Sequence, residues 1–162
     1  MPSITPCLWM DTQSEEAAHF YVSIFPNSRI IDVARYPDVG PGEPGAVLTV
    51  NFELDGQRYV ALNGGPQFHF TEAVSFQIDC ADQAEVDHYW DRLTDGGEES
   101  QCGWLKDRYG LSWQVIPRQL PELLGDPDPE RSSRALQAML GMRKLDVAVL
   151  QAAADGRQPA PA

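Results

Sequence analysis

The stretch 101–117 places a thiol, an amine, a carboxylate and an amide close together, in the order QCGWLKDRYGLSWQVIP. A nucleophilic thiolate needs a cation or a base beside it to lower its pKa. Lys106 shares a predicted strand face with Cys102, but strand rise separates them by about 13 Å. We therefore interpret Cys102 as an inert packed thiol. Lys106-Asp107, before Arg108-Tyr109-Gly110, fits a turn better than acid–base chemistry.

Gln114 is the residue whose orientation decides what this stretch does. Side chains alternate between the two faces of a strand. Leu111, Trp113 and Val115 therefore lie on one face, and Ser112, Gln114 and Ile116 lie on the other. The all-apolar set should pack beneath a helix, which turns Gln114 towards the other face. A regular turn also puts Trp104 opposite Trp113, so Trp104 is the better candidate to line a cavity.

Other potential ligating or reactive groups are scattered along the chain. His19 and His88 fall on predicted helices, off their apolar faces, and His69 lies between the two halves. The sequence contains neither His-x-His nor His-Glu-x-x-His spacing. Cys7 and Cys80 are interpreted as small core residues. Asn63, before Gly64-Gly65-Pro66, either orients a ligand or caps the turn at the end of a strand, and both interpretations stay open.

The elements that must position these residues occur twice in the same order. The first half predicts a strand at 4–10, a helix at 14–25, a strand at 29–36, and a hairpin of 46–54 and 57–62 around Asp55-Gly56. The second half predicts a strand at 74–79, a helix at 85–93, and two strands within 101–117. The halves overlay at a constant offset that brings Glu16 onto Glu85 and His19 onto His88. This match favours an internal duplication.

The predicted fold is therefore α+β, with two tandem βαβββ modules at about 4–64 and 73–117. This pattern predicts that the two modules form one curved, mixed, eight-stranded sheet whose concave face encloses a cavity. In this interpretation Ile4, Pro6 and Leu8 of the first strand lie on the concave face. The corresponding residues of the fifth strand are Ala73, Ser75 and Gln77. Helices at about 119–153 complete a single domain, 1–154, because Leu136, Met139, Leu140, Leu145, Ala148 and Leu150 form an apolar stripe. The tail 155–162 is expected to be disordered.

Composition limits the classes of partner. The chain has 162 residues, 43% of them hydrophobic, and a net charge of -12. This acidity disfavours nucleic acid and anionic membranes. No stretch has the roughly 20 continuous apolar residues of a membrane span. The N-terminus lacks the pattern of an export signal and the three cysteines lack disulfide or zinc spacing, so a reduced, cytoplasmic protein is expected.

Four stretches carry a family resemblance: ITPCLW at 4–9, HFY to FPNS at 19–28, LNGGP at 62–66, and QCGWLKD with GLSWQ within 101–114. With them the chain resembles the vicinal oxygen chelate superfamily, the fold of glyoxalase I and bleomycin-resistance proteins, and within it the PhnB-like group. Members of this group sometimes carry the name 3-demethylubiquinone-9 3-methyltransferase. The resemblance implies a homodimer that pairs modules across subunits.

The resemblance also implies four positions where metal-dependent members hold a divalent ion. They fall near Ile4, Leu62 and Ala73 and on Gln114. The first three cannot coordinate a metal, and one amide oxygen does not make a site. The expectation is thus a binder of small molecules without metal or other cofactor. The alternatives are a metal-dependent glyoxalase-like lyase, isomerase or dioxygenase, and a structural dimer with a filled cavity.

The expected ligand pocket combines residues from both modules, and whether it catalyses a reaction is left open. Its members are Leu8, Asn63, Phe70, Ser75, Gln77, Cys102, Trp104 and Gln114.

Overall fold

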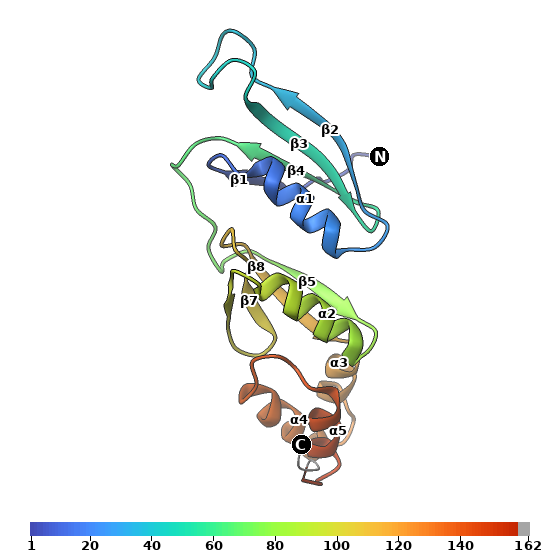
Figure 1. Ribbon diagram of the computed structural model, residues 1–162. Helices are drawn as coiled ribbons and strands as arrows, with labels where there is room; N and C mark the ends of the chain where they lie inside the picture. The colour runs from blue at the N-terminus through green and yellow to red at the C-terminus, as the bar shows by residue number, and fades with distance from the viewer. Residues whose placement is uncertain (159–162) are drawn as a thin grey trace. The chain divides into compact units, whose positions relative to one another are not determined.

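The computed structural model describes residues 1–158, which divide into two compact units between Phe70 and Thr71 (Figure 1). Each unit holds one βαβββ module, and the C-terminal helices belong to the second unit. The α+β prediction of two tandem modules is confirmed. Within residues 1–158 the eight strands form two four-stranded sheets, one in each unit, instead of the single eight-stranded sheet that was expected.

The first module begins its first strand later than predicted, at Cys7. Its elements are β1 (Cys7–Met10), α1 (Ser14–Ile24), β2 (Arg29–Arg35), β3 (Val47–Leu54) and β4 (Gln57–Asn63). The strand order is β1-β4-β3-β2, with β1 parallel to β4 and the other neighbours antiparallel. Asp55 and Gly56 both have positive φ, 47° and 84°, which is the geometry of the tight hairpin that this dipeptide predicts.

One face of this sheet is covered by α1. The helix buries Ala17 and Tyr21, and β3 buries Val50 and Phe52 against it. The rings of Tyr21 and Phe52 stack with their centroids 6.2 Å apart. The other face of the sheet is not covered by α1, and we call it the open face of the first sheet.

The second module repeats this topology. Its elements are β5 (Ser75–Cys80), α2 (Gln83–Thr94), β6 (Glu98–Glu99), β7 (Trp104–Lys106) and β8 (Ser112–Pro117), in the order β5-β8-β7-β6. Helix α2 covers one face, where Leu105, Trp113 and Val115 are buried (Figure 1). Trp113 is only 3% exposed, as the alternation of β8 predicts. The face opposite α2 is the open face of the second sheet.

The two modules differ by one residue between the first strand and the helix. Three residues separate β1 from α1, whereas only Ala81 and Asp82 separate β5 from α2. An offset taken from the helices therefore misplaces the first strand by one residue, and such a shift moves every side chain to the opposite face. Leu8 accordingly lies 5% exposed beneath α1, level with Ala61, and Cys7 is exposed. The predicted orientation of this strand, with Leu8 on the concave face and Cys7 in the core, is wrong.

Three helices follow the second sheet: α3 (Gln119–Leu124), α4 (Pro129–Leu140) and α5 (Val147–Ala154). They bury their own core against the end of β8. Its buried members are Ile116, Leu120, Leu123, Ala135, Leu145, Leu150 and Ala154. Part of the predicted apolar stripe remains outside this core, since Leu136 is 42% and Leu140 60% exposed.

The helices are attached to α2 through the side-chain amide of Gln83. Its Nε2 donates to the carbonyl of Leu145 at 3.0 Å, and its Oε1 accepts from the backbone N–H of Val147 at 2.8 Å. Past α5, the backbone N–H groups of residues 155–157 donate back to the last turn of the helix. Residues 159–162, the rest of the predicted disordered tail, lie outside the described residues.

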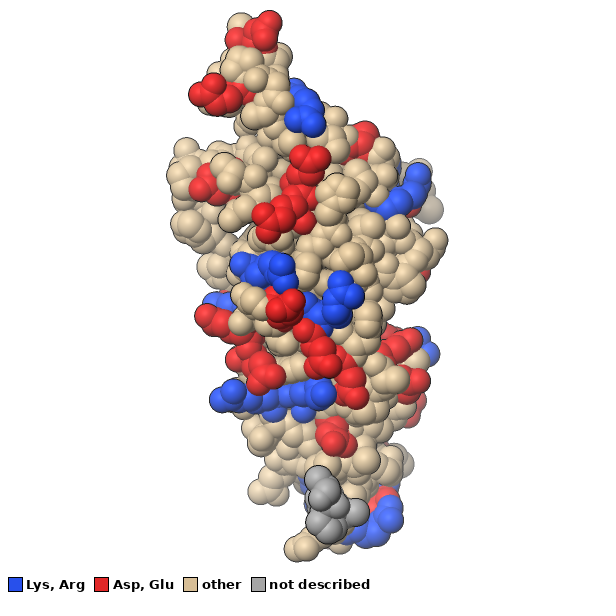
Figure 2. All heavy atoms as spheres, in the orientation of Figure 1, with Lys and Arg blue, Asp and Glu red and all other residues tan. Residues whose placement is uncertain are grey.

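Basic and acidic side chains lie next to one another on the face that Figure 2 shows. Among the ion pairs of the described residues, Arg131 pairs with Asp126 at 2.9 Å and with Asp155 at 2.6 Å. None of the helices within residues 1–158 has the length and apolar composition to cross a membrane.

Candidate functional site

The open face of the second sheet brings together several of the predicted site residues. Trp104, Gln114 and Gln77 lie level with one another on β7, β8 and β5. The same registers place Lys106 and Ser112 level with Ser75 in the adjoining row. Within each strand these residues are two positions apart, and side chains two positions apart point to the same face of a sheet. The result is a polar surface crossed by one aromatic ring.

Gln114 has the orientation that the sequence predicts. It is half-buried on the open face, and its Nε2 donates to the Ser75 hydroxyl at 2.9 Å. Gln77 is exposed beside it. A neutral amide loses far less than a carboxylate when it is shielded from water, provided that it is hydrogen-bonded. The pair therefore offers an amide oxygen and a hydroxyl to a molecule on this face.

A small cavity of about 120 Å³ adjoins this surface next to Trp104, Lys106 and Ser112. Lys106 Nζ lies 2.5 Å from a carboxylate oxygen of Glu72, which comes from the segment before β5. The hydrogen bond raises the pKa of Lys106 and lowers that of Glu72. Ser112 is 1% exposed, and within the described residues its Oγ has no hydrogen-bond partner.

Asp107 holds the turn between β7 and β8, as predicted for a structural role. Its Oδ1 accepts from the backbone N–H groups of Tyr109 at 2.9 Å and Leu111 at 3.1 Å. Its Oδ2 accepts from Trp113 Nε1 at 2.8 Å. The turn thus fixes the alternation of β8 and, with it, the outward direction of Gln114.

Among residues 1–158, the surroundings of the thiols show no arrangement for nucleophilic catalysis. Cys102 lies before β7, in a turn where its φ is +58°, so it does not share the strand face of Trp104. Its backbone N–H donates to the Met142 carbonyl at 2.8 Å. Burial, followed by nearby carboxylates, raises the pKa of Cys80 to about 12, so this thiol stays protonated near neutral pH.

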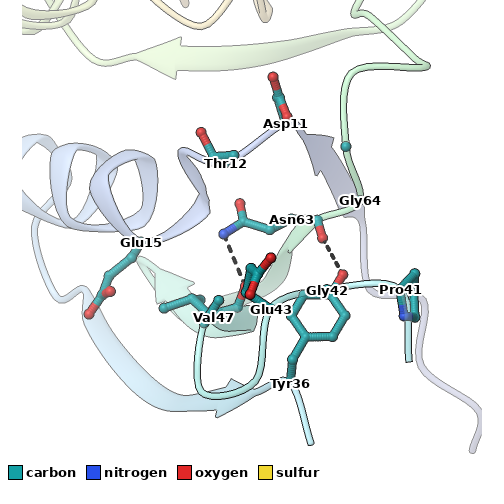
Figure 3. Close-up of a pocket in the computed structure, with 12 residues that line it drawn as sticks. Asp11, Thr12, Glu15, Tyr36, Pro41, Gly42, Glu43, Val47, Asn63 and Gly64 are labelled. Atoms are coloured by element: carbon teal, nitrogen blue, oxygen red, sulfur yellow. Dashed lines mark hydrogen bonds between the residues drawn. The ribbon is translucent and has the colours of Figure 1, made fainter. Parts of the chain in front are cut away.

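A larger cavity, of about 390 Å³, lies within the first unit near the ends of β3 and β4 (Figure 3). Asn63 and Tyr36 line it, together with the acidic side chains of Asp11, Glu15 and Glu43. The Tyr36 hydroxyl donates to the Asn63 carbonyl at 2.7 Å.

Asn63 was expected either to orient a ligand or to cap a turn. Its Oδ1 accepts from the backbone N–H of Ser14 at 2.9 Å, and its Nδ2 donates to the Val47 carbonyl at 3.1 Å. Both ends of the amide therefore connect β4 to the start of α1 and to β3. This arrangement supports the structural interpretation, although Asn63 also lines the cavity.

Phe70 is half-buried at the end of the first unit, and Leu8 lies in the core. Trp9 takes the place expected of Leu8 on the open face of the first sheet. Its Nε1 donates to the Gly65 carbonyl at 2.9 Å, and its ring meets Phe68 edge-on at 4.9 Å. Sequence reasoning placed Ser112 on the face of Gln114 but missed Trp9 and Glu72.

The donors on the open face of the second sheet do not fit a divalent transition metal. Gln114, Gln77 and Ser75 offer neutral oxygens, whereas such ions take several nitrogen, thiolate or carboxylate donors. In the part of the chain that the structure describes, no three His, Cys, Asp or Glu side chains converge in a way that would hold an ion.

Comparisons with known proteins agree with this fold. Residues 2–116 match the model of the family described as 3-demethylubiquinone-9 3-methyltransferase. The PhnB protein of Bacillus cereus, which carries the same description, is 33% identical with a TM-score of 0.66, over 72% of this chain and 99% of its own. The match to the family ends at Ile116, so α3, α4 and α5 lie beyond it.

Two other solved structures share the fold at lower identity. A Pseudomonas aeruginosa protein is 17% identical with a TM-score of 0.62, over 72% of this chain and 98% of its own. FosX, a fosfomycin resistance protein of Listeria monocytogenes solved with Mn(II) and sulfate, is 16% identical with a TM-score of 0.53, over 76% of this chain and 94% of its own. No curated protein matches the sequence.

Proposed function

We propose that this chain, which belongs to the PhnB-like 3-demethylubiquinone-9 3-methyltransferase family of the vicinal oxygen chelate superfamily, binds a small organic molecule without a resident metal ion. The observation that carries the proposal is the hydrogen-bonded pair of Gln114 and Ser75 beside the half-buried ring of Trp104. A small-molecule site typically combines an aromatic or apolar surface with a few fixed polar groups. The ligand lies on the open face of the second sheet.

The chemistry of the donors supports the proposed absence of a resident metal. The Mn(II) in FosX belongs to that protein, and at 16% identity only the fold is shared. Around Gln114 this chain offers amide and hydroxyl groups, which hydrogen-bond organic molecules well and bind transition metals weakly. Metal-dependent lyase, isomerase or dioxygenase chemistry is the alternative that the first experiment addresses.

We do not propose that this chain transfers methyl groups, although the description of its family names a methyltransferase. A methyltransferase of the common kind holds its cofactor at a glycine-rich loop between a strand and the helix that follows. Gly64 and Gly65 follow β4, but the next helix, α2, begins at Gln83, after β5. The loop therefore lacks the helix N-terminus that such a site uses.

The first experiment measures metal content and ligand binding together. The protein is purified without chelators, and zinc, nickel, iron and manganese are quantified for the unaltered chain, Q114A and Q114E. We expect less than stoichiometric metal in all three, because one carboxylate at 114 still lacks partner ligands. Stoichiometric metal that is lost in Q114A would establish the metal-dependent alternative.

Ligand binding is tested with a library of small organic molecules, by thermal shift and by NMR. Binding should perturb the resonances of Trp104 and Gln114 and should weaken in Q114A. Thr94→Ala, at the C-terminal end of α2, serves as a control. If no compound reaches this face, the third interpretation, a structural dimer with a filled cavity, replaces the proposal.

The proposal includes a homodimer in a reducing, cytoplasmic setting. Half-buried apolar side chains on the open face of the first sheet, such as Trp9 and Leu62, give a second copy surface to cover, and the three cysteines are free. Sedimentation at micromolar concentration should show about twice the 18.0 kDa of one chain. A species of 18.0 kDa alone would contradict the dimer.

A further inference from the structure

The small cavity beside Trp104 is lined by a residue whose hydroxyl the fold itself does not satisfy. Ser112 lines this cavity, its side chain is almost fully buried, and its Oγ lacks a hydrogen-bond partner within residues 1–158. Buried hydroxyls nearly always have a partner, in protein, water or ligand. A cavity of about 120 Å³ is large enough for several water molecules or for the polar end of a small organic molecule.

A cation stands next to this hydroxyl. Lys106 and Ser112 are directly opposed on β7 and β8, so their side chains leave the same face as close neighbours. Both residues line the small cavity, one with an ammonium group and the other with a hydroxyl. This pairing of donors is suited to a carboxylate, which accepts from both.

Glu72 already places a carboxylate there. It reaches Lys106 from the segment before β5, with an oxygen 2.5 Å from Nζ. Its side chain is 62% exposed, and ion pairs this open to water are weak. Glu72 is therefore held loosely enough for another carboxylate to replace it on Lys106.

We propose that Lys106 and Ser112 bind the carboxylate of a small monocarboxylic acid, and that Glu72 occupies this position when the ligand is absent. The inference rests on the proposed function, to which it adds the class of ligand. Replacing one carboxylate by another leaves the charge of the cavity unchanged. A dianion such as a phosphonate is disfavoured, because Glu98 lies opposite Lys106 and Glu99 also lines the cavity. The organic part of the acid lies against the ring of Trp104.

The test uses benzoate as the probe, with benzamide as its uncharged analogue and phenylphosphonate as the dianion. Affinities are measured by NMR titration for the full chain and for E72Q, K106M and S112A. The control is D95N, which removes the carboxylate charge from the Asp95–Arg108 pair of the same unit, at residues that do not line the cavity.

We expect the unaltered protein to bind benzoate more tightly than either analogue. E72Q should bind it about two- to fivefold more tightly, because it removes a competitor held by a weak exposed pair. S112A should weaken binding by about tenfold, through loss of a hydrogen bond to a charged group. K106M should abolish the preference for benzoate over benzamide, and D95N should change nothing.

Two results would overturn the inference while leaving the proposed function standing. One is benzamide binding as tightly as benzoate, with shifts at Trp104 and Gln114. The other is benzoate binding that is the same in E72Q and K106M as in the unaltered chain. Failure of every library compound to perturb Trp104 and Gln114 would instead remove the proposed function itself.

Discussion

Asp107 Oδ2 accepts a hydrogen bond from Trp113 Nε1 at 2.8 Å, which joins the β7–β8 turn to the core beneath α2. Asp107 is 3% exposed and Trp113 is 3% exposed, so neither group can exchange this bond for water without local opening. The bond couples the shape of the turn to the position of the indole. It also determines which residues of β8 face outwards, including Gln114.

The first prediction concerns the polarity of this bond. In D107N the Nδ2 group can take the place of Oδ2 and then meets the Trp113 N–H donor to donor, so the free energy of unfolding should fall by about 1–3 kcal/mol. In a W113F background, where that donor is absent, the same change should cost less. Urea unfolding of the four proteins measures the coupling. Equal costs in both backgrounds would show that the bond adds no stability.

The second prediction separates the two tryptophans of this hairpin. W113A should lower the free energy of unfolding by about 3–5 kcal/mol, because it empties a buried site. W104A should cost less, since Trp104 is half-buried on the open face. Acrylamide quenching of variants that retain one tryptophan should reach Trp104 more readily. Stronger quenching of Trp113 would invert the assignment of the faces.

The third prediction concerns Gly64. A Cβ at this position would overlap the ring of Trp9, so G64A should destabilise the first unit by about 1–3 kcal/mol. In a W9A background the penalty should shrink, because the space is empty. Gly141 is the matched control, since its added Cβ meets only the Ala138 carbonyl oxygen at 3.7 Å. Thermal unfolding of these variants measures the difference.

The fourth prediction concerns acid. Hydrogen bonds from Arg131 and then Arg157 lower the pKa of Asp155 to about 2, from an ordinary value of 3.8. A lowered carboxyl pKa stabilises the fold above pH 3.8, and this contribution disappears as the pH falls towards 2. The Tm difference between the unaltered protein and D155N should therefore be constant near neutral pH, shrink between about pH 4 and pH 2, and vanish only below about pH 2. A difference that does not shrink between pH 4 and pH 2 would assign the effect to packing.

The second module could be predicted well because its last strand carries a clear signal. Trp113 and Val115 alternate with Ser112 and Gln114, so the buried and open faces have different chemistry. In β1 the run of Cys7 to Met10 is apolar on both faces, and alternation gives no answer there. The offset taken from the helices then decided the orientation of β1, and a connector longer by one residue reversed it.

The small cavity could not be predicted from local patterns. Glu72 meets Lys106 across more than thirty residues of sequence, and Ser112 is notable only because it lacks a partner in the folded chain. The division into two four-stranded sheets also depends on which strand edges pair, and the strand pattern is the same for one sheet or two.

Gln83 acts as a peptide unit supplied by a side chain, since its amide makes the same donor and acceptor pair as a neighbouring strand would. An amide does not titrate, whereas the carboxylates that hold Arg131 do. Protonation of carboxylates therefore weakens the ion pairs of Arg131, and also the pair of Lys144 with Asp87 on α2, but it leaves the amide bonds of Gln83 in place. The C-terminal helices, which lie beyond the family match, thus keep a connection to α2 that does not depend on pH.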